Sequence, residues 1–219
     1  EQRGYKRATI SSGRGQRLDT QVRNSGRNMY DSKPDADLLY QRLKPHLPEV
    51  LRGRRCAGLN ERLRFLRYDP GEYFAPHFDG EYRRNDGQQI SRLTVMVYLN
   101  SGGGVDYDDG ETRFVPIETR KFASKPTVDY GLKVVPEIGD CLVFSHEVFH
   151  EGREVTRGRK YAVRTDAMYG AEMTRRMRRI APAGAMKVVV VVVILVELTI
   201  VHFSATFACH CCIFNRAIA

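Results

Sequence analysis

The chain has 219 residues, enough for one domain of ordinary size with flanking segments. Hydrophobic residues make up 42% and charged residues 28% of the sequence, so a folded core can form. The formal net charge is +9, but the excess of Lys and Arg lies in residues 1–31 and 171–219. The segment between these ends is nearly neutral and offers no broad phosphate-binding surface, which argues against nucleic acid as a partner.

Cysteine usage excludes a disulfide framework, because the five cysteines are an odd number and three of them crowd the last eleven residues. Cys56 and Cys141 are predicted to be small buried hydrophobic residues. The run from Cys209 to Cys212 includes His210 but lacks the spacing of a zinc site. Incidental cysteines are therefore the favoured interpretation of this run.

Residues 1–31 are polar and basic, and they are predicted to be a partly disordered leader with a short strand from Arg17 to Arg23. The chain begins with Glu1 rather than Met, so we expect a fragment or a processed chain that could lack a targeting segment.

A helix is predicted to start at Ser32–Asp35, where a capping serine precedes a proline and an acidic residue. Leu38, Leu39 and Leu43 form an apolar stripe, and the prolines that follow end the helix. We expect this helix to pack against the outside of a sheet.

The segment from Leu63 to Tyr169 contains short apolar or alternating runs separated by turns, which is typical of β-strands. Arg157-Gly158 is predicted to be the turn of a hairpin between two of these strands. The sequence has no internal repeat and no phosphate-binding glycine loop. The prediction is a mainly β fold with flanking helices, built on a double-stranded β-helix (jelly roll) over residues 32–170. The expected strands are 63–68, 93–99, 112–115, 132–135, 141–144, 154–155 and 160–163.

Residues 171–219 are predicted to be a basic linker followed by an apolar tail. Residues 188–214 are long enough to span a bilayer, although Glu197 interrupts them at a cost of about 2.5 kcal/mol or more. Two interpretations stay open: a membrane anchor, or an amphipathic appendage on a cytoplasmic protein. Oligomeric state is not indicated.

The most informative motif is His77-Phe78-Asp79. In an extended segment, residues two apart point to the same side, so the imidazole and the carboxylate converge. A later histidine, either His146 or His150, would complete a set of two histidines and one carboxylate. That set suits non-haem Fe(II), because it holds one face of the octahedron and leaves three positions open. The motif by itself is weak, since His-x-Asp is frequent by chance.

Lys160 follows His150 by ten residues and begins a predicted strand. Alternation along this strand puts Lys160 and Arg164 on the same face. A cation inside a barrel requires an anion. A five-carbon dicarboxylate bound to iron through one end would supply that anion at its other end.

Five spaced segments, covering about half the chain, resemble the prolyl 4-hydroxylase-like branch of the 2-oxoglutarate/Fe(II)-dependent dioxygenases. The order of the segments is also that of the family. One departure is Asp109-Gly110, where the family usually has a glycine pair, and it concerns the loop on the substrate side. The segments are Arg67-Tyr68-x5-Phe74-x2-His77-Phe78-Asp79-Gly80, Leu93–Asn100, Gly110-Glu111-Thr112-Arg113-Phe114, Gly139-Asp140-x3-Phe144 and His150-Glu151-Gly152-x7-Lys160-Tyr161.

The resemblance implies that His77, Asp79 and His150 are the catalytic residues that bind Fe(II), with His146 as the alternative ligand. It also implies that Lys160 pairs with the distal carboxylate of 2-oxoglutarate. The Tyr98 hydroxyl is expected to help Lys160, and Arg164 to contact cosubstrate or substrate or to order the ligands. Tyr68 and Tyr73 either line the pocket or are core aromatic residues.

The implied function is a 2-oxoglutarate- and Fe(II)-dependent dioxygenase that hydroxylates a prolyl residue or a similar side chain and releases succinate and CO2. Ascorbate would keep the iron reduced. Two alternatives are the same chemistry on a free amino acid or an alkylated base, and a non-enzymatic metal-binding jelly roll. The substrate, a peptide or a small molecule, is not identified by the polar loops at 81–90 and 101–109.

Overall fold

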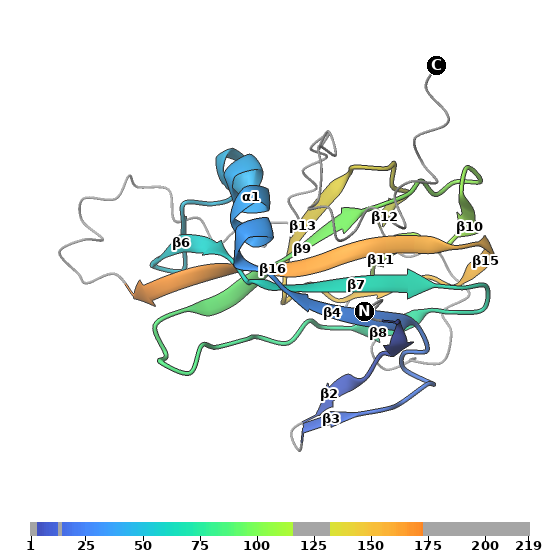
Figure 1. Ribbon diagram of the computed structural model, residues 1–219, viewed down its shortest axis with the longest axis horizontal. Coiled ribbons are helices and arrows are strands. Elements are labelled where there is room, and N and C mark those ends of the chain that lie inside the picture. The colour runs from blue at the N-terminus through green and yellow to red at the C-terminus, as the bar shows by residue number, and fades with distance from the viewer. Residues whose placement is uncertain (1–3, 13–14, 116–131, 173–219) are drawn as a thin grey trace.

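The computed structural model describes residues 4–12, 15–115 and 132–172, which form a mainly β structure with one α-helix (Figure 1). The predicted apolar tail and the cysteines at 209–212 lie outside the described residues. Within the described part, no helix is both long and apolar enough to cross a membrane. The two interpretations of the tail therefore stay predictions, as does the division of the chain at residues 31 and 170.

Two sheets face each other. The larger sheet has eight strands in the described residues, and its longest strand, β16 (Lys160–Glu172), pairs with three others. The order is β1 (Lys6–Arg7), β4 (Gly26–Asp31), β7 (Arg62–Tyr68), β16, β6 (Arg54–Leu59) and β5 (Val50–Leu51), with β9 (Ile90–Tyr98) on β16 and β13 (Cys141–Ser145) on β9. The smaller sheet is β12 (Lys133–Val134), β11 (Thr112–Phe114), β14 (His150–Gly152) and β8 (Phe74–His77). Two short pairs complete the strands: β10 (Tyr107–Asp109) with β15 (Val155–Gly158), and β2 (Ile10–Ser12) with β3 (Gly15–Arg17).

An apolar cluster joins the two sheets. It combines Tyr98, Leu142 and Ala162 from the larger sheet with Phe114 and Val134 from the smaller sheet. This face-to-face packing, with antiparallel pairing throughout, is the predicted jelly roll, so the prediction of fold class is confirmed.

Helix α1 (Lys33–Leu43) covers the outer face of the larger sheet, as predicted (Figure 1). Ser32 caps it by accepting a hydrogen bond from the Asp35 backbone nitrogen at 3.3 Å. A short 3-10 turn, η1 (Lys44–His46), follows it. Leu39 and Leu43 are buried in the core cluster of this face, but Leu38 is 47% exposed, so the predicted stripe is wrong at that residue.

Two predicted local features differ from the structure. The expected strand from Arg17 to Arg23 is wrong, because β3 ends at Arg17, a turn follows, and the next strand is β4. The hairpin at Arg157-Gly158 is also wrong: β15 pairs with β10, whereas β16 pairs with β6, β7 and β9. Long-range pairing with other strands decided both.

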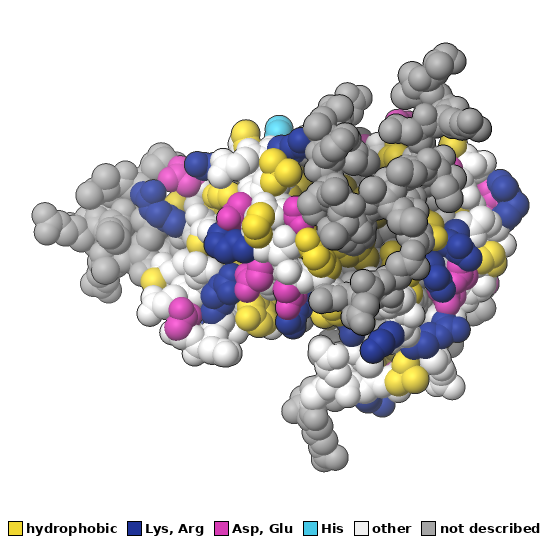
Figure 2. All heavy atoms as spheres, viewed as in Figure 1, with side chains coloured by type: hydrophobic (Ala, Val, Ile, Leu, Met, Phe, Trp, Pro, Cys, Tyr) yellow, Lys and Arg dark blue, Asp and Glu magenta, His cyan; other side chains and the backbone are white. Residues whose placement is uncertain are grey.

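Charged side chains of both signs are interspersed on the face shown in Figure 2, where described Lys and Arg side chains lie beside Asp and Glu. Ion pairs between side chains of opposite charge in the described residues include Arg62–Asp31 and Arg84–Glu61.

Leu39→Ala should lower the free energy of unfolding by about 2–5 kcal/mol, because it removes buried apolar volume between α1 and the sheet. Leu38→Ala is the matched control on the same helix and should change the free energy by less than about 1 kcal/mol. Urea denaturation of the two variants measures both values. Equal losses would contradict the described packing of α1.

Candidate metal centre

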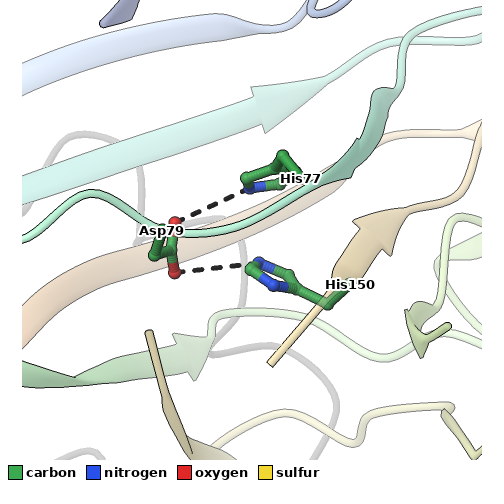
Figure 3. Close-up of side chains that lie close together, drawn as sticks. All are labelled: His77, Asp79 and His150. Carbon is green, nitrogen blue, oxygen red and sulfur yellow. Dashed lines mark ion pairs between the residues drawn. The ribbon is translucent and has the colours of Figure 1, made fainter. Parts of the chain in front are cut away.

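Three candidate ligands converge between the sheets (Figure 3). His77 ends β8, Asp79 follows two residues later, and His150 begins β14. Strands β8 and β14 are antiparallel neighbours in which His150 pairs with His77, so both imidazoles project side by side. His77 Nε2 lies 3.6 Å from Asp79 Oδ1, and His150 Nε2 lies 3.7 Å from Asp79 Oδ2.

Backbone carbonyls fix the orientation of both imidazoles. Nδ1 of His77 lies 2.8 Å from the Ala75 oxygen, and Nδ1 of His150 lies 3.0 Å from the Val148 oxygen. A carbonyl only accepts, so each Nδ1 donates its proton to that oxygen and each Nε2 faces Asp79, on the side from which a metal ion would be bound. Burial, with a smaller contribution from His77, lowers the pKa of His150 to about 3. His150 is therefore neutral at physiological pH, as a metal ligand must be.

The Asp79 carboxylate is ionised although its side chain is only 3% exposed. Burial alone would raise the pKa of Asp79, but the guanidinium of Arg164 holds it well below its usual range. Nη2 of Arg164 lies 3.0 Å from Oδ1, and the Thr94 hydroxyl donates to Oδ2. The carboxylate is thus held in one orientation by a cation and a neutral donor.

This donor set fits Fe(II). Two imidazole nitrogens and one carboxylate oxygen lie within 4.8 Å of one another, which matches one face of an octahedral ion with the opposite positions open. Across residues 4–12, 15–115 and 132–172, no second group of three such side chains meets the same distance criterion.

Lys160 lies in the pocket that these ligands line. Its side chain is almost fully buried and donates to the Gly110 oxygen at 2.6 Å. The ammonium is 5.4 Å from the ring centroids of Tyr68 and Tyr98. No carboxylate of the described chain forms an ion pair with it, and burial lowers its pKa to about 8 despite the opposing effect of Glu111. The ammonium thus has hydrogen-bonding capacity left for an anion.

The other candidates occupy different surroundings. The Tyr98 hydroxyl bonds to the Thr112 hydroxyl at 2.8 Å. Tyr68 is both a buried core aromatic residue and part of the pocket lining, so both interpretations of Tyr68 hold. Tyr73 is outside the pocket lining, since its hydroxyl donates to the Gln21 oxygen, and its expected pocket role is wrong. His146 lies apart from the three ligands, 3.6 Å from Asp166, so the structure gives no support to it as the alternative ligand.

Arg164 shares a face with Lys160, as predicted, and it bridges Asp79 and Asp166. The hairpin predicted at Arg157-Gly158 does not form, and Arg164 pairs instead with Arg64 of β7 and Met96 of β9. Sequence reasoning missed Thr94 and Arg23. Thr94 lies in a predicted strand whose inward face could have drawn attention to it, whereas no local signal marked Arg23 as a residue of this pocket.

Comparison with known proteins agrees with this geometry. Residues 63–165 match the family described as the 2OG-Fe(II) oxygenase superfamily. Probable prolyl 4-hydroxylase 3 and probable prolyl 4-hydroxylase 10 of Arabidopsis thaliana are 29% and 30% identical to this chain over an alignment 122 residues long. Each alignment covers 47% of this chain and 40% of the relative. The chain therefore matches about two fifths of the length of these curated relatives.

Solved structures resemble the chain in fold. A prolyl hydroxylase of Trichoplax adhaerens, in complex with a peptide fragment of the oxygen degradation domain of hypoxia inducible factor, has a TM-score of 0.51 at 15% identity. The similarity covers 81% of this chain and 74% of that one. A Pseudomonas putida prolyl 4-hydroxylase has a TM-score of 0.48 at 19% identity, over 75% and 78% of the two chains.

The match to the 2OG-Fe(II) oxygenase superfamily covers just under half of the chain and contains all three candidate ligands and Lys160. Together with the two Arabidopsis relatives, this match confirms the resemblance to prolyl 4-hydroxylase-like oxygenases that was drawn from the motifs. The predicted cofactors Fe(II) and 2-oxoglutarate are those of the superfamily, and His77, Asp79 and His150 offer a donor set that fits the iron.

His150→Ala should abolish the visible charge-transfer band that Fe(II) and 2-oxoglutarate form together without oxygen, because the two remaining ligands no longer hold a face of the ion. His146→Ala is the matched control, since His146 contacts Asp166 instead, and it should keep the band. Anaerobic absorption spectroscopy measures both. Retention of the band in His150→Ala would refute the ligand set.

Stability should rise with pH through the titration of Lys160. The pKa of Lys160 is about 8 in the folded chain and about 10.5 ordinarily, so the unfolded chain binds more protons between these values. The free energy of unfolding of the wild type, minus that of Lys160→Met, should therefore increase from pH 8 to pH 10. Urea titrations at several pH values measure it. A constant difference would mean that the ammonium is not desolvated.

Proposed function

We propose that the chain is a 2-oxoglutarate- and Fe(II)-dependent dioxygenase that hydroxylates a prolyl residue or a similar side chain. The observation that carries this proposal is one pocket that combines a donor set for iron with a buried lysine lacking an anionic partner. A metal-binding module without activity would need the three ligands but not Lys160. The pairing of both features supports an enzyme.

Bound Fe(II) and 2-oxoglutarate supply the oxidative chemistry, in which O2 converts the cosubstrate to succinate and CO2 and leaves one oxygen atom in the hydroxylated product. His77, Asp79 and His150 hold the metal in this proposal. Arg164 and Thr94 keep the Asp79 carboxylate from rotating, since each contacts a different oxygen of it.

Lys160 neutralises the distal carboxylate of the cosubstrate. A charge-assisted hydrogen bond of this type contributes about 1.5–3 kcal/mol. The aromatic rings of Tyr68 and Tyr98 line the ammonium and keep water away from it. The Gly110 oxygen satisfies one of its three donors and fixes its direction.

The proposed substrate class is supported by a solved structure of similar fold and by a second cavity. The prolyl hydroxylase of Trichoplax adhaerens is bound to a peptide. We infer that this chain also acts on a peptide or a small molecule. A second cavity, of about 390 Å³, shares Asp79 with the pocket and gives a substrate room beside the metal. Ascorbate serves as the reductant that keeps the iron in the ferrous state.

The test is succinate formation from 2-oxoglutarate by the purified chain with Fe(II), ascorbate and a pool of prolyl peptides, with mass spectrometry of the peptides for an added oxygen atom. Lys160→Met should weaken 2-oxoglutarate binding by about 10- to 150-fold. Lys133→Met, at an exposed lysine of β12, is the control and should leave it unchanged. Absence of succinate with every peptide would count against a prolyl substrate, and absence of 2-oxoglutarate binding against the enzyme class.

A further inference from the structure

Arg23 reaches the metal pocket from a segment that precedes the family domain. Its backbone forms an antiparallel bridge with Phe74 of β8. Two further backbone bonds hold the segment there, from Asn24 to the Tyr73 oxygen and from Ala75 to the Val22 oxygen. The segment therefore lies against the strand that ends in His77, and its position is fixed on both sides of Arg23.

The side chain of Arg23 is buried beside the metal ligands. The residue is 5% exposed, and its guanidinium carbon is 4.5 Å from the centroid of the Phe74 ring. Phe74 in turn stacks on His77, with centroids 3.5 Å apart. Nε of Arg23 donates to the Ser25 hydroxyl at 2.9 Å. The guanidinium lines the same pocket as Asp79 and Lys160.

Arg23 differs from the other buried arginines in having no carboxylate partner. Arg64 pairs with Asp166 at 3.0 Å, and Arg113 pairs with Glu151 at 2.7 Å. No carboxylate among the described residues lies within ion-pair distance of Arg23, and burial lowers its pKa. A buried cation without an anion costs several kcal/mol. A bound anion would offset that cost.

The charge of the loaded pocket points to the source of that anion. Three cations line the pocket: Arg23, Lys160 and Arg164. Of its two carboxylates, Asp79 pairs with Arg164 and Glu151 pairs with Arg113. Arg23 and Lys160 therefore leave an excess of two positive charges. Fe(II) and doubly ionised 2-oxoglutarate cancel each other, so this excess persists when both are bound.

Buried hydrogen-bond donors near Asp79 that lack an acceptor also favour an anion in this pocket. The buried Nε atoms of Arg92 and Arg164 have no hydrogen-bond partner. An arginine nitrogen can only donate, so both require an acceptor. Arg164 lines the metal pocket, and Arg92 lines the larger cavity that also contains Asp79. The walls on both sides of the metal position are thus suited to an anionic group.

We propose that the substrate carries a carboxylate close to the carbon that is hydroxylated, and that Arg23 binds this carboxylate. The inference rests on the proposed function and names its substrate class. The carboxylate is either the α-carboxylate of a free or C-terminal prolyl residue, or the side chain of an acidic neighbour in a peptide. Arg23 acts on the substrate, whereas Lys160 acts on 2-oxoglutarate.

The test compares Arg23→Gln with Arg27→Gln. Arg27 lies on β4 in the same part of the chain, but it bonds to Thr9 and is not part of the pocket lining. Titration of 2-oxoglutarate into each Fe(II)-loaded variant without oxygen, followed by the charge-transfer band, should give the wild-type affinity within about threefold. This step separates a substrate contact from a cosubstrate contact.

The second step adds four probes to the Fe(II)–2-oxoglutarate complex: L-proline, acetyl-Pro-NH2, acetyl-Pro-Asp-NH2 and acetyl-Pro-Asn-NH2. Binding is measured by calorimetry and by the shift of the band. The wild type and Arg27→Gln should bind at least one carboxylate probe about tenfold or more tightly than its neutral partner. Arg23→Gln should lose this preference, and Arg23→Lys should restore part of it. L-Proline and the Asp peptide distinguish the two sources of the carboxylate.

Equal binding of charged and neutral probes by the wild type, or no binding of either carboxylate probe, would overturn the proposal. So would a loss of 2-oxoglutarate affinity of about tenfold in Arg23→Gln, because Arg23 would then belong to the cosubstrate site. Failure of the proposed function looks different: the wild type would bind no 2-oxoglutarate, or it would bind a carboxylate probe without hydroxylating it. Calorimetry still reports in those cases whether carboxylate binding depends on Arg23.

Discussion

Strand β16 contributes apolar side chains to one face of the larger sheet and charged side chains to the other. It pairs with β6, β7 and β9, and its side chains alternate between the two sides. Val163 and Ala167 face the cluster beneath α1, whereas Lys160 and Arg164 face the interior between the sheets. The same strand thus supports the main hydrophobic core and the chemistry of the pocket. A shift of its register by one residue would exchange these two sets of side chains, so the pairing of β16 is the constraint on which the site depends.

The interior face concentrates charge where desolvation is costly. Asp79, Arg164 and Asp166 form a buried chain of ion pairs that Arg64 extends, and each pair offsets the burial of its members. Lys160 and Arg23 form no direct ion pair with a carboxylate of the described chain, although Glu111 favours the charge on Lys160 and Asp79 that on Arg23. A fold retains unpaired buried cations at the expense of stability, and in this pocket they flank the three candidate metal ligands. Anion binding and folding are coupled here, since ligands that supply negative charge stabilise the native state.

Local sequence patterns predicted the secondary-structure elements better than they predicted which strands pair with one another. The strand runs that include Phe65, Val95 and Val143 were predictable because apolar residues in short β-type runs must be buried somewhere. The hairpin expected at Arg157-Gly158 does not form, because these residues belong to β15, which pairs with β10, whereas β16 pairs with β6, β7 and β9. Leu38 followed the helical period and is nevertheless exposed, because the side of α1 that packs on the sheet carries Ala36, Leu39 and Leu43 instead.

The sequence by itself determined the donor types and their order: the His-x-Asp spacing of His77 and Asp79, a later histidine at 146 or 150, and Lys160 after them. The residue types are given directly by the sequence, and the two-residue repeat of an extended segment puts His77 and Asp79 on the same side. Only the tertiary structure decided which histidine joins the pair, because His150 is in register with His77 across β8 and β14 while His146 faces Asp166. Only the tertiary structure brought Arg23 into the pocket, since a contact between residues 23 and 74 depends on long-range strand pairing that no local pattern encodes.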